Sequence, residues 1–158
     1  MILFPTAMLS LLAASPASAT VLPFTLIEAT CSGGIAGRRR TVRLGPDGRL
    51  SSSEGWRGSF VPAGQITPAE AHALSQRLDR VAFADLPSLK RGRTVYDGIS
   101  CMLKRQGQAT HVLQFSAGSV APKPGDAARY QEARAVMCAI MDAANQVKLN
   151  PQPIPPGD

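Results

Sequence analysis

The residues with the widest scope for chemistry in this chain are two histidines and three cysteines. Metal ligation and acid–base catalysis need such side chains to converge with carboxylates or with each other. His72 and His111 are far apart in the chain, and neither has a companion histidine or carboxylate at a metal-ligand spacing. No Gly-x-Ser-x-Gly motif is present to activate a serine. We therefore expect no enzyme activity, and no catalytic, cofactor-binding or metal-binding residues.

The three cysteines, Cys31, Cys101 and Cys138, are widely separated, and no pair has a chelating spacing such as Cys-x-x-Cys. This pattern favours a disulfide over a metal site, with one thiol left over because the count is odd. Cys138 borders the apolar face of a predicted helix and can reach an inward cysteine on a sheet, so the preferred bridge joins Cys101 to Cys138. A bridge between Cys31 and Cys101, which both face inward on predicted strands, is the alternative. Disulfide formation disfavours a nucleophile built from Cys31 or Cys101 with His111.

The clearest element that could position these side chains is a helix over residues 67–86. Thr67 is a good N-cap residue, Pro68 suits the first helical position, and Glu70 completes a capping box. Apolar residues then recur at spacings of three and four, which places them on one face of the helix: Ala71, Leu74, Leu78 and Val81. The pattern predicts an amphipathic helix that covers a sheet.

Runs of alternating polar and apolar residues predict the strands of that sheet. They span residues 24–31, 38–44, 98–104 and 110–115, and residues 50–53 are a candidate short return strand. A second amphipathic helix is predicted over residues 126–146. The expected fold is α+β, with a mainly antiparallel four-stranded sheet in strand-strand-helix-strand-strand-helix order and both helices on one face.

Arginines are concentrated on the second predicted strand. Arg38, Arg39, Arg40 and Arg43 follow a glycine-rich break that contains Gly33 and Gly34. One interpretation is a solvated strand face that discourages edge pairing. The other is a contact surface for an acidic partner, which makes these residues the candidate partner-binding set. A phosphate-binding loop is disfavoured because no Gly-Lys-Ser/Thr sequence follows the glycines.

The only tryptophan, Trp56, follows the candidate return strand and has two open interpretations. A lone tryptophan flanked by Gly55 and Arg57 can be an exposed binding anchor. A place at the edge of the core is favoured, since large aromatic side chains are usually well buried.

The first nineteen residues predict a signal peptide. A short apolar run over residues 8–14 precedes a small-x-small cleavage site at residues 17–19, and the run is too short to span a bilayer. We expect a periplasmic or secreted protein with no transmembrane segment. The expected organisation is a signal peptide over residues 1–19, one α+β domain over 20–149 and a disordered proline-rich tail over 150–158.

The chain carries a net charge of +6, none of it in the predicted signal peptide. A basic surface can bind anionic lipid or polysaccharide nonspecifically. Export and the lack of any nucleic-acid-binding motif lead us to expect no nucleic-acid partner.

Three stretches together resemble the emfourin-like proteins, which are small bacterial inhibitors of thermolysin-type metallopeptidases. They are SGGIAGRRRTVRLGPDGRL, ITPAEAHALSQRLDRVAFADLP and DGISCMLKRQGQATHVLQF. The likeness covers about residues 24–116. The matching features are the glycines after the first strand (Gly33, Gly34 and Gly37), the capped helix ending at residues 83–87, Asp97 before the third strand, and Gly107 in the hairpin that follows it. The resemblance implies a protease inhibitor with a protein partner, which we expect to be an exported monomer without a cofactor. The alternative is an envelope-associated structural protein that binds anionic lipid or polysaccharide through a basic face.

Overall fold

The computed structural model describes residues 23–33, 37–89, 98–116 and 118–146. The predicted signal peptide, the predicted tail and Gly34 lie outside these residues. The strands are β1 (Phe24–Gly33), β2 (Arg38–Leu44), β3 (Arg49–Glu54), β4 (Val61–Gln65), β5 (Ser100–Gly107) and β6 (Thr110–Ser116). The helices are α1 (Pro68–Arg80) and α2 (Ala127–Gln146), each adjoined by a short 3-10 turn, Phe83–Asp85 after α1 and Pro124–Asp126 before α2.

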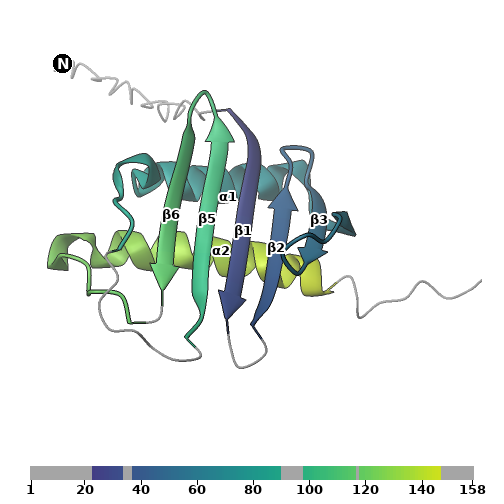
Figure 1. Ribbon diagram of the computed structural model, residues 1–158. Coiled ribbons are helices and arrows are strands. Elements are labelled where there is room, and N and C mark those ends of the chain that lie inside the picture. The colour runs from purple at the N-terminus through teal and green to yellow at the C-terminus, as the bar shows by residue number, and fades with distance from the viewer. Residues whose placement is uncertain (1–22, 34–36, 90–97, 117, 147–158) are drawn as a thin grey trace, which may run out of the picture.

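The six strands form one antiparallel sheet in the order β4-β3-β2-β1-β5-β6. Both helices run across the same face of this sheet, and the described part of the chain places no helix on the other face (Figure 1). We call the uncovered face the open face. The α+β class is confirmed, whereas the expected four-stranded sheet is wrong because β3 and β4 add two strands on the β2 side.

The additional strand β4 is not among the strands predicted from the sequence. Its Pro62 and Gly64 are poor strand formers, but β4 is at the edge of the sheet and pairs on one side only. An edge strand tolerates proline because the missing N–H faces away from the neighbouring strand. The β3–β4 register shifts between Leu50 and Ser51, which accommodates the irregular strand.

Alternation along the strands builds the core on the helix-covered face. Strands β1, β2, β5 and β6 contribute side chains that are fully buried: Ile27, Ala29, Val42, Leu44, Leu103 and Leu113. Helix α2 adds the buried side chains Tyr130, Ala133, Val136, Met137, Ile140 and Ala144. Burial of such side chains is the main force that holds the helices on the sheet.

Helix α1 begins as its sequence predicts. The Glu70 backbone N–H donates to Thr67 Oγ1 (3.2 Å), and the Thr67 N–H donates to Glu70 Oε2 (2.8 Å), which completes the capping box. The helix ends at Arg80, earlier than the predicted Leu86, because Ala82 adopts a left-handed conformation with φ of 47°. The chain then makes the 3-10 turn before Leu86.

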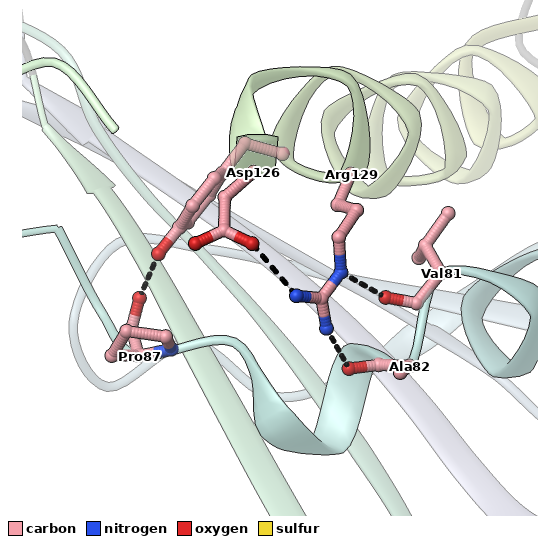
Figure 2. A network of polar contacts seen from close by, with 6 residues as sticks. Val81, Ala82, Pro87, Asp126 and Arg129 are labelled. Atoms are coloured by element: carbon pink, nitrogen blue, oxygen red, sulfur yellow. Dashed lines mark hydrogen bonds and ion pairs between the residues drawn. The ribbon is translucent and has the colours of Figure 1, made fainter. Parts of the chain in front are cut away.

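A side chain of α2 donates hydrogen bonds to two carbonyl groups at this early end of α1. Arg129 Nε donates to the Val81 carbonyl (2.8 Å), and Nη2 donates to the Ala82 carbonyl (3.0 Å). Figure 2 shows the guanidinium between these carbonyls and Asp126, whose Oδ1 accepts from Nη1 at 2.8 Å. In the same network the Tyr130 hydroxyl donates to the Pro87 carbonyl. This network fixes the end of α1 against the start of α2.

The disulfide joins Cys31 of β1 to Cys101 of β5, so the preferred bridge between Cys101 and Cys138 is not the one formed. The physical reason is the strand register: Cys31 and Cys101 are direct partners across the β1–β5 pair, with Cα atoms 4.1 Å apart. Cys138 is a free, exposed cysteine on the flank of α2. A disulfide in this position is typical of proteins from an oxidising compartment. None of the helices among the described residues has the length and apolar character needed to cross a membrane.

Candidate functional site

The four arginines of β2 are divided between the two faces of the sheet. Arg39 and Arg43 alternate with the buried Val42 and Leu44 and therefore lie on the open face. Arg40 lies on the helix-covered face, where it donates to the side-chain oxygen of Asn145 and lies 3.3 Å from a Glu54 carboxylate oxygen. Arg38, at the start of the strand, is exposed. The predicted contact set is thus not one continuous surface.

Arg39 and Trp56 form a contact on the open face. The Arg39 guanidinium carbon lies 4.6 Å from the centre of the Trp56 ring. The Trp56 side chain is 73% exposed. This corrects the favoured interpretation of Trp56 as an edge-of-core residue, because the chain after β3 turns onto the open face and carries the ring away from the core. An arginine over a tryptophan face is a cation–π contact.

The segment that carries Trp56 is held on the sheet by two hydrogen bonds. The Gly55 N–H donates to the Arg39 carbonyl (2.8 Å), and the Ser53 hydroxyl donates to the Gly58 carbonyl (2.7 Å). Gly55 has a φ of +79°, a conformation that favours glycine. Trp56 is therefore presented from a short, tethered turn rather than from a long loop.

Arg43 and Phe60 form a second contact of the same kind. The Arg43 guanidinium carbon lies 3.6 Å from the centre of the Phe60 ring, and Arg43 Nε lies 2.8 Å from Glu28 Oε2. Glu28 is on the neighbouring strand and is only 8% exposed. Next to this pair, the hydroxyl groups of Thr30 and Thr41 are hydrogen-bonded at 3.0 Å. The strands under the two arginines are thus fixed by cross-strand polar contacts.

We name the set Arg39, Arg43, Trp56 and Phe60 the open-face patch. Its two guanidinium groups differ in their partners. Arg43 is paired with Glu28, whereas within the described part of the chain no carboxylate lies within ion-pair distance of Arg39. Arginine and tryptophan are the residue types most enriched among side chains that dominate protein–protein binding energies. The patch can therefore offer an exposed aromatic surface and hydrogen-bond donors to a carboxylate on a partner.

Gly33 lies beside this region and has a packing role. It ends β1 with a φ of +131°, and a Cβ atom at this position would lie 2.3 Å from the Gly98 carbonyl oxygen. Only glycine allows the backbone before β5 to come so close. The structure places Gly33 opposite Arg38 in the β1–β2 register, so it shapes the end of the hairpin. Gly34 lies outside the described residues.

The histidines are in separate places. His72 is exposed on α1 and its ring lies edge-on to Phe24, with ring centres 5.5 Å apart. His111 is on β6, opposite Arg105, and is half-buried. Among residues 23–33, 37–89, 98–116 and 118–146, no three His, Cys, Asp or Glu side chains gather as a metal-ion site would require.

The arginines of the patch were predicted from the sequence, and the position of Trp56 between Gly55 and Arg57 suggested an exposed binding anchor. That interpretation of Trp56 was the less favoured of the two, and Phe60, which gave no such signal, was not predicted as a site residue. No protein-family model matches the chain. The curated proteins with which it was compared contain no match either.

Proposed function

We propose that this chain is an exported, non-enzymatic binding protein that captures a protein partner through the open-face patch. The observation that carries this proposal is the exposure of Trp56 beneath a guanidinium group that has no carboxylate partner in the described structure. A monomer in water gains little from ordering these two side chains at its surface, since exposed cation–π contacts contribute only about 0.5–1 kcal/mol. A partner that buries both would gain from the aromatic area and from a hydrogen-bonded ion pair.

The partner chemistry that fits the patch is an acidic protein surface. Arg39 supplies positive charge on β2, because Arg43 is neutralised by Glu28, and the exposed Arg57 follows Trp56 in the chain. Electrostatic complementarity of this kind speeds association and selects the partner. The resemblance to emfourin-like proteins supports a metallopeptidase of the thermolysin type as that partner, with the chain acting as its inhibitor.

The test is a titration of the purified protein against a panel of thermolysin-type metallopeptidases, with residual peptidase activity and direct binding followed together. Stoichiometric inhibition by the wild type is expected. Trp56→Ala and Arg39→Ala should each weaken binding by about tenfold or more, since such anchor residues contribute about 2 kcal/mol or more when truncated. Arg80→Ala is the matched control, because Arg80 is an exposed arginine on α1, on the other side of the sheet.

Three outcomes separate this proposal from its rivals. Binding without inhibition would retain the binding function and reject the inhibitor role. Equal losses in Arg39→Ala and Arg80→Ala would show that net charge matters and the patch does not. Binding to anionic vesicles or polysaccharide that disappears between low and physiological salt, with no peptidase binding, would favour an envelope-associated role.

A further inference from the structure

A groove on the helix-covered side of the sheet lies apart from the open-face patch. It has a volume of about 680 Å³ and opens between α2 and the ends of β1, β5 and β6 near the disulfide. Cys31 and Cys101 line its sheet side, and Cys138 lines its helix side. A volume of this size is within the range of sites that bind small molecules, about 300–1,000 Å³. We call it the α2 groove.

The walls of the α2 groove are mainly apolar. They include Ile99, Phe115, Val120, Met137 and Met141. Ile99 is 59% exposed and Val120 is 55% exposed, although both are large aliphatic residues. Exposed apolar side chains that gather around one concave surface mark a binding site more often than scattered ones do. Methionine side chains are flexible and adapt to ligands of varied shape.

Charge is confined to two positions on the helix wall. Arg134 and Asp142 both line the groove and are exposed. They are eight residues apart on α2, which corresponds to about 12 Å along the helix axis. Neither has an ion-pair partner in the part of the chain that the structure describes. The groove therefore has a positive end and a negative end, joined by an apolar wall that includes Met137 and Met141.

We propose that the α2 groove binds a medium-chain fatty acid, with the carboxylate at Arg134 and the acyl chain along the methionines. Charge complementarity sets the head group: a carboxylate pairs with Arg134 and is repelled by Asp142, which fixes the orientation of the chain. The distance between Arg134 and Asp142 sets the length of the ligand, because an acyl chain about as long as two turns of the helix fits between them. The ligand gains the hydrophobic free energy of the apolar wall and one charge-assisted contact.

Cys138 provides a built-in reporter of occupancy. It is free, exposed and lines the groove, so a bound ligand should shield it from alkylation. The experiment measures the rate of Cys138 alkylation by iodoacetamide in the full-length protein, by intact mass, with and without sodium decanoate below its micelle concentration. Calorimetric titration of decanoate provides the affinity. We expect saturable binding and a several-fold slower alkylation at saturation.

A relocated cysteine is the control for nonspecific effects on the reaction. Cys138→Ser combined with Ala135→Cys moves the thiol to an exposed position of α2 that does not line the groove. Decanoate should leave the alkylation rate of this variant unchanged. Equal protection of both thiols would overturn the proposal, since it would reflect a general effect of the fatty acid on the protein.

Two variants test the assigned roles. Arg134→Ala should weaken decanoate binding by about tenfold and leave decanol binding unchanged, because only the charge-assisted contact is lost. Val120→Trp fills the groove from an exposed position and should abolish binding of both ligands. Circular dichroism confirms that each variant folds. Decylamine should bind more weakly than decanoate.

The remaining outcomes overturn the proposal. Absence of both heat and protection with decanoate would reject a fatty-acid site in the folded chain. Loss of decanoate and decanol binding to the same extent in Arg134→Ala would reject the carboxylate contact. Protection by phospholipid vesicles alone would assign the groove to membrane acyl chains instead. The Trp56→Ala variant should bind decanoate as the wild type does. Fatty-acid binding can therefore be tested independently of the proposed peptidase contact.

Discussion

Arg39 and Arg43 lie four residues apart on the same face of β2, and each stacks on an aromatic ring, but only Arg43 is also bound to a buried carboxylate. The Arg43 Nε to Glu28 Oε2 distance is 2.8 Å, and Glu28 is 8% exposed. Arg39 stacks on Trp56, which is largely exposed. Two arginines of the same cluster therefore have different roles. Arg43 pairs with a buried carboxylate of the sheet, and Arg39 is available to a partner at the surface.

This difference predicts that the two alanine variants differ in their free energy of unfolding. Arg43→Ala should lower the free energy of unfolding by about 1–3 kcal/mol, because it leaves the Glu28 carboxylate buried without its partner. Arg39→Ala should change the free energy of unfolding by less than about 0.5 kcal/mol, as surface substitutions usually do. Urea denaturation measures both. Equal stability of the two variants would mean that the Glu28 pair does not contribute to folding.

The disulfide predicts a large loss of stability on removal. It closes a loop with a sequence separation of 70 residues between Cys31 and Cys101. In the chain-entropy treatment, a loop of this length corresponds to about 4 kcal/mol. Cys31→Ser combined with Cys101→Ser should therefore lower the free energy of unfolding by about that amount. Cys138→Ser is the matched control and should have little effect, because the thiol is exposed and unbonded. A strong effect of Cys138→Ser with none of the double variant would indicate a different bridge in solution.

Features of this structure that depend on neighbouring residues could be predicted from the sequence, and features that depend on distant residues could not. The start of α1 was predictable because Thr67, Pro68 and Glu70 are adjacent and their contacts lie within one turn. The strand Arg38–Leu44 was predicted to the residue, since its alternation is regular. The end of α1 was not predictable, because the left-handed Ala82 depends on hydrogen bonds from Arg129, which is distant in the chain.

The disulfide and the open-face patch depended on non-local geometry. Cys31 and Cys101 become partners only through the β1–β5 register, which the alternation of either strand alone does not specify. The exposure of Trp56 depends on the direction in which the chain leaves β3, and a one-residue change in this turn would place the ring elsewhere. The charge of the arginines was visible in the sequence, but their division between two faces required the strand pairing.

The contact between Arg129 and the end of α1 predicts a localised destabilisation. Arg129→Ala removes donors to the carbonyls of Val81 and Ala82 and an ion pair with Asp126. The loss should be about 1.5–3 kcal/mol, as found for hydrogen bonds that involve a charged group. Hydrogen exchange should be faster at the end of α1 and at the start of α2, with β1 and β5 protected as before. Arg80→Ala is the control for loss of one exposed charge. Uniformly faster exchange throughout the sheet would contradict a local role.

The ion pair between the helices predicts a specific dependence of stability on pH. Arg77 Nε on α1 lies 2.6 Å from Glu132 Oε1 on α2. The hydrogen bond from Arg77 is the main cause that holds the pKa of Glu132 below its ordinary value of 4.5. A carboxyl group whose pKa is lowered by folding stabilises the protein above its ordinary pKa, and this contribution is lost as the pH falls through the lowered value. Glu132→Gln should therefore flatten the curve of unfolding free energy against pH below about 4.5 and reduce stability at pH 7.

Arg77→Ala should flatten the same part of the curve, because it removes the cause of the shift in the pKa of Glu132. Combining the two substitutions should give no further flattening, and a change additional to that of either single variant would show that the two groups act on stability independently.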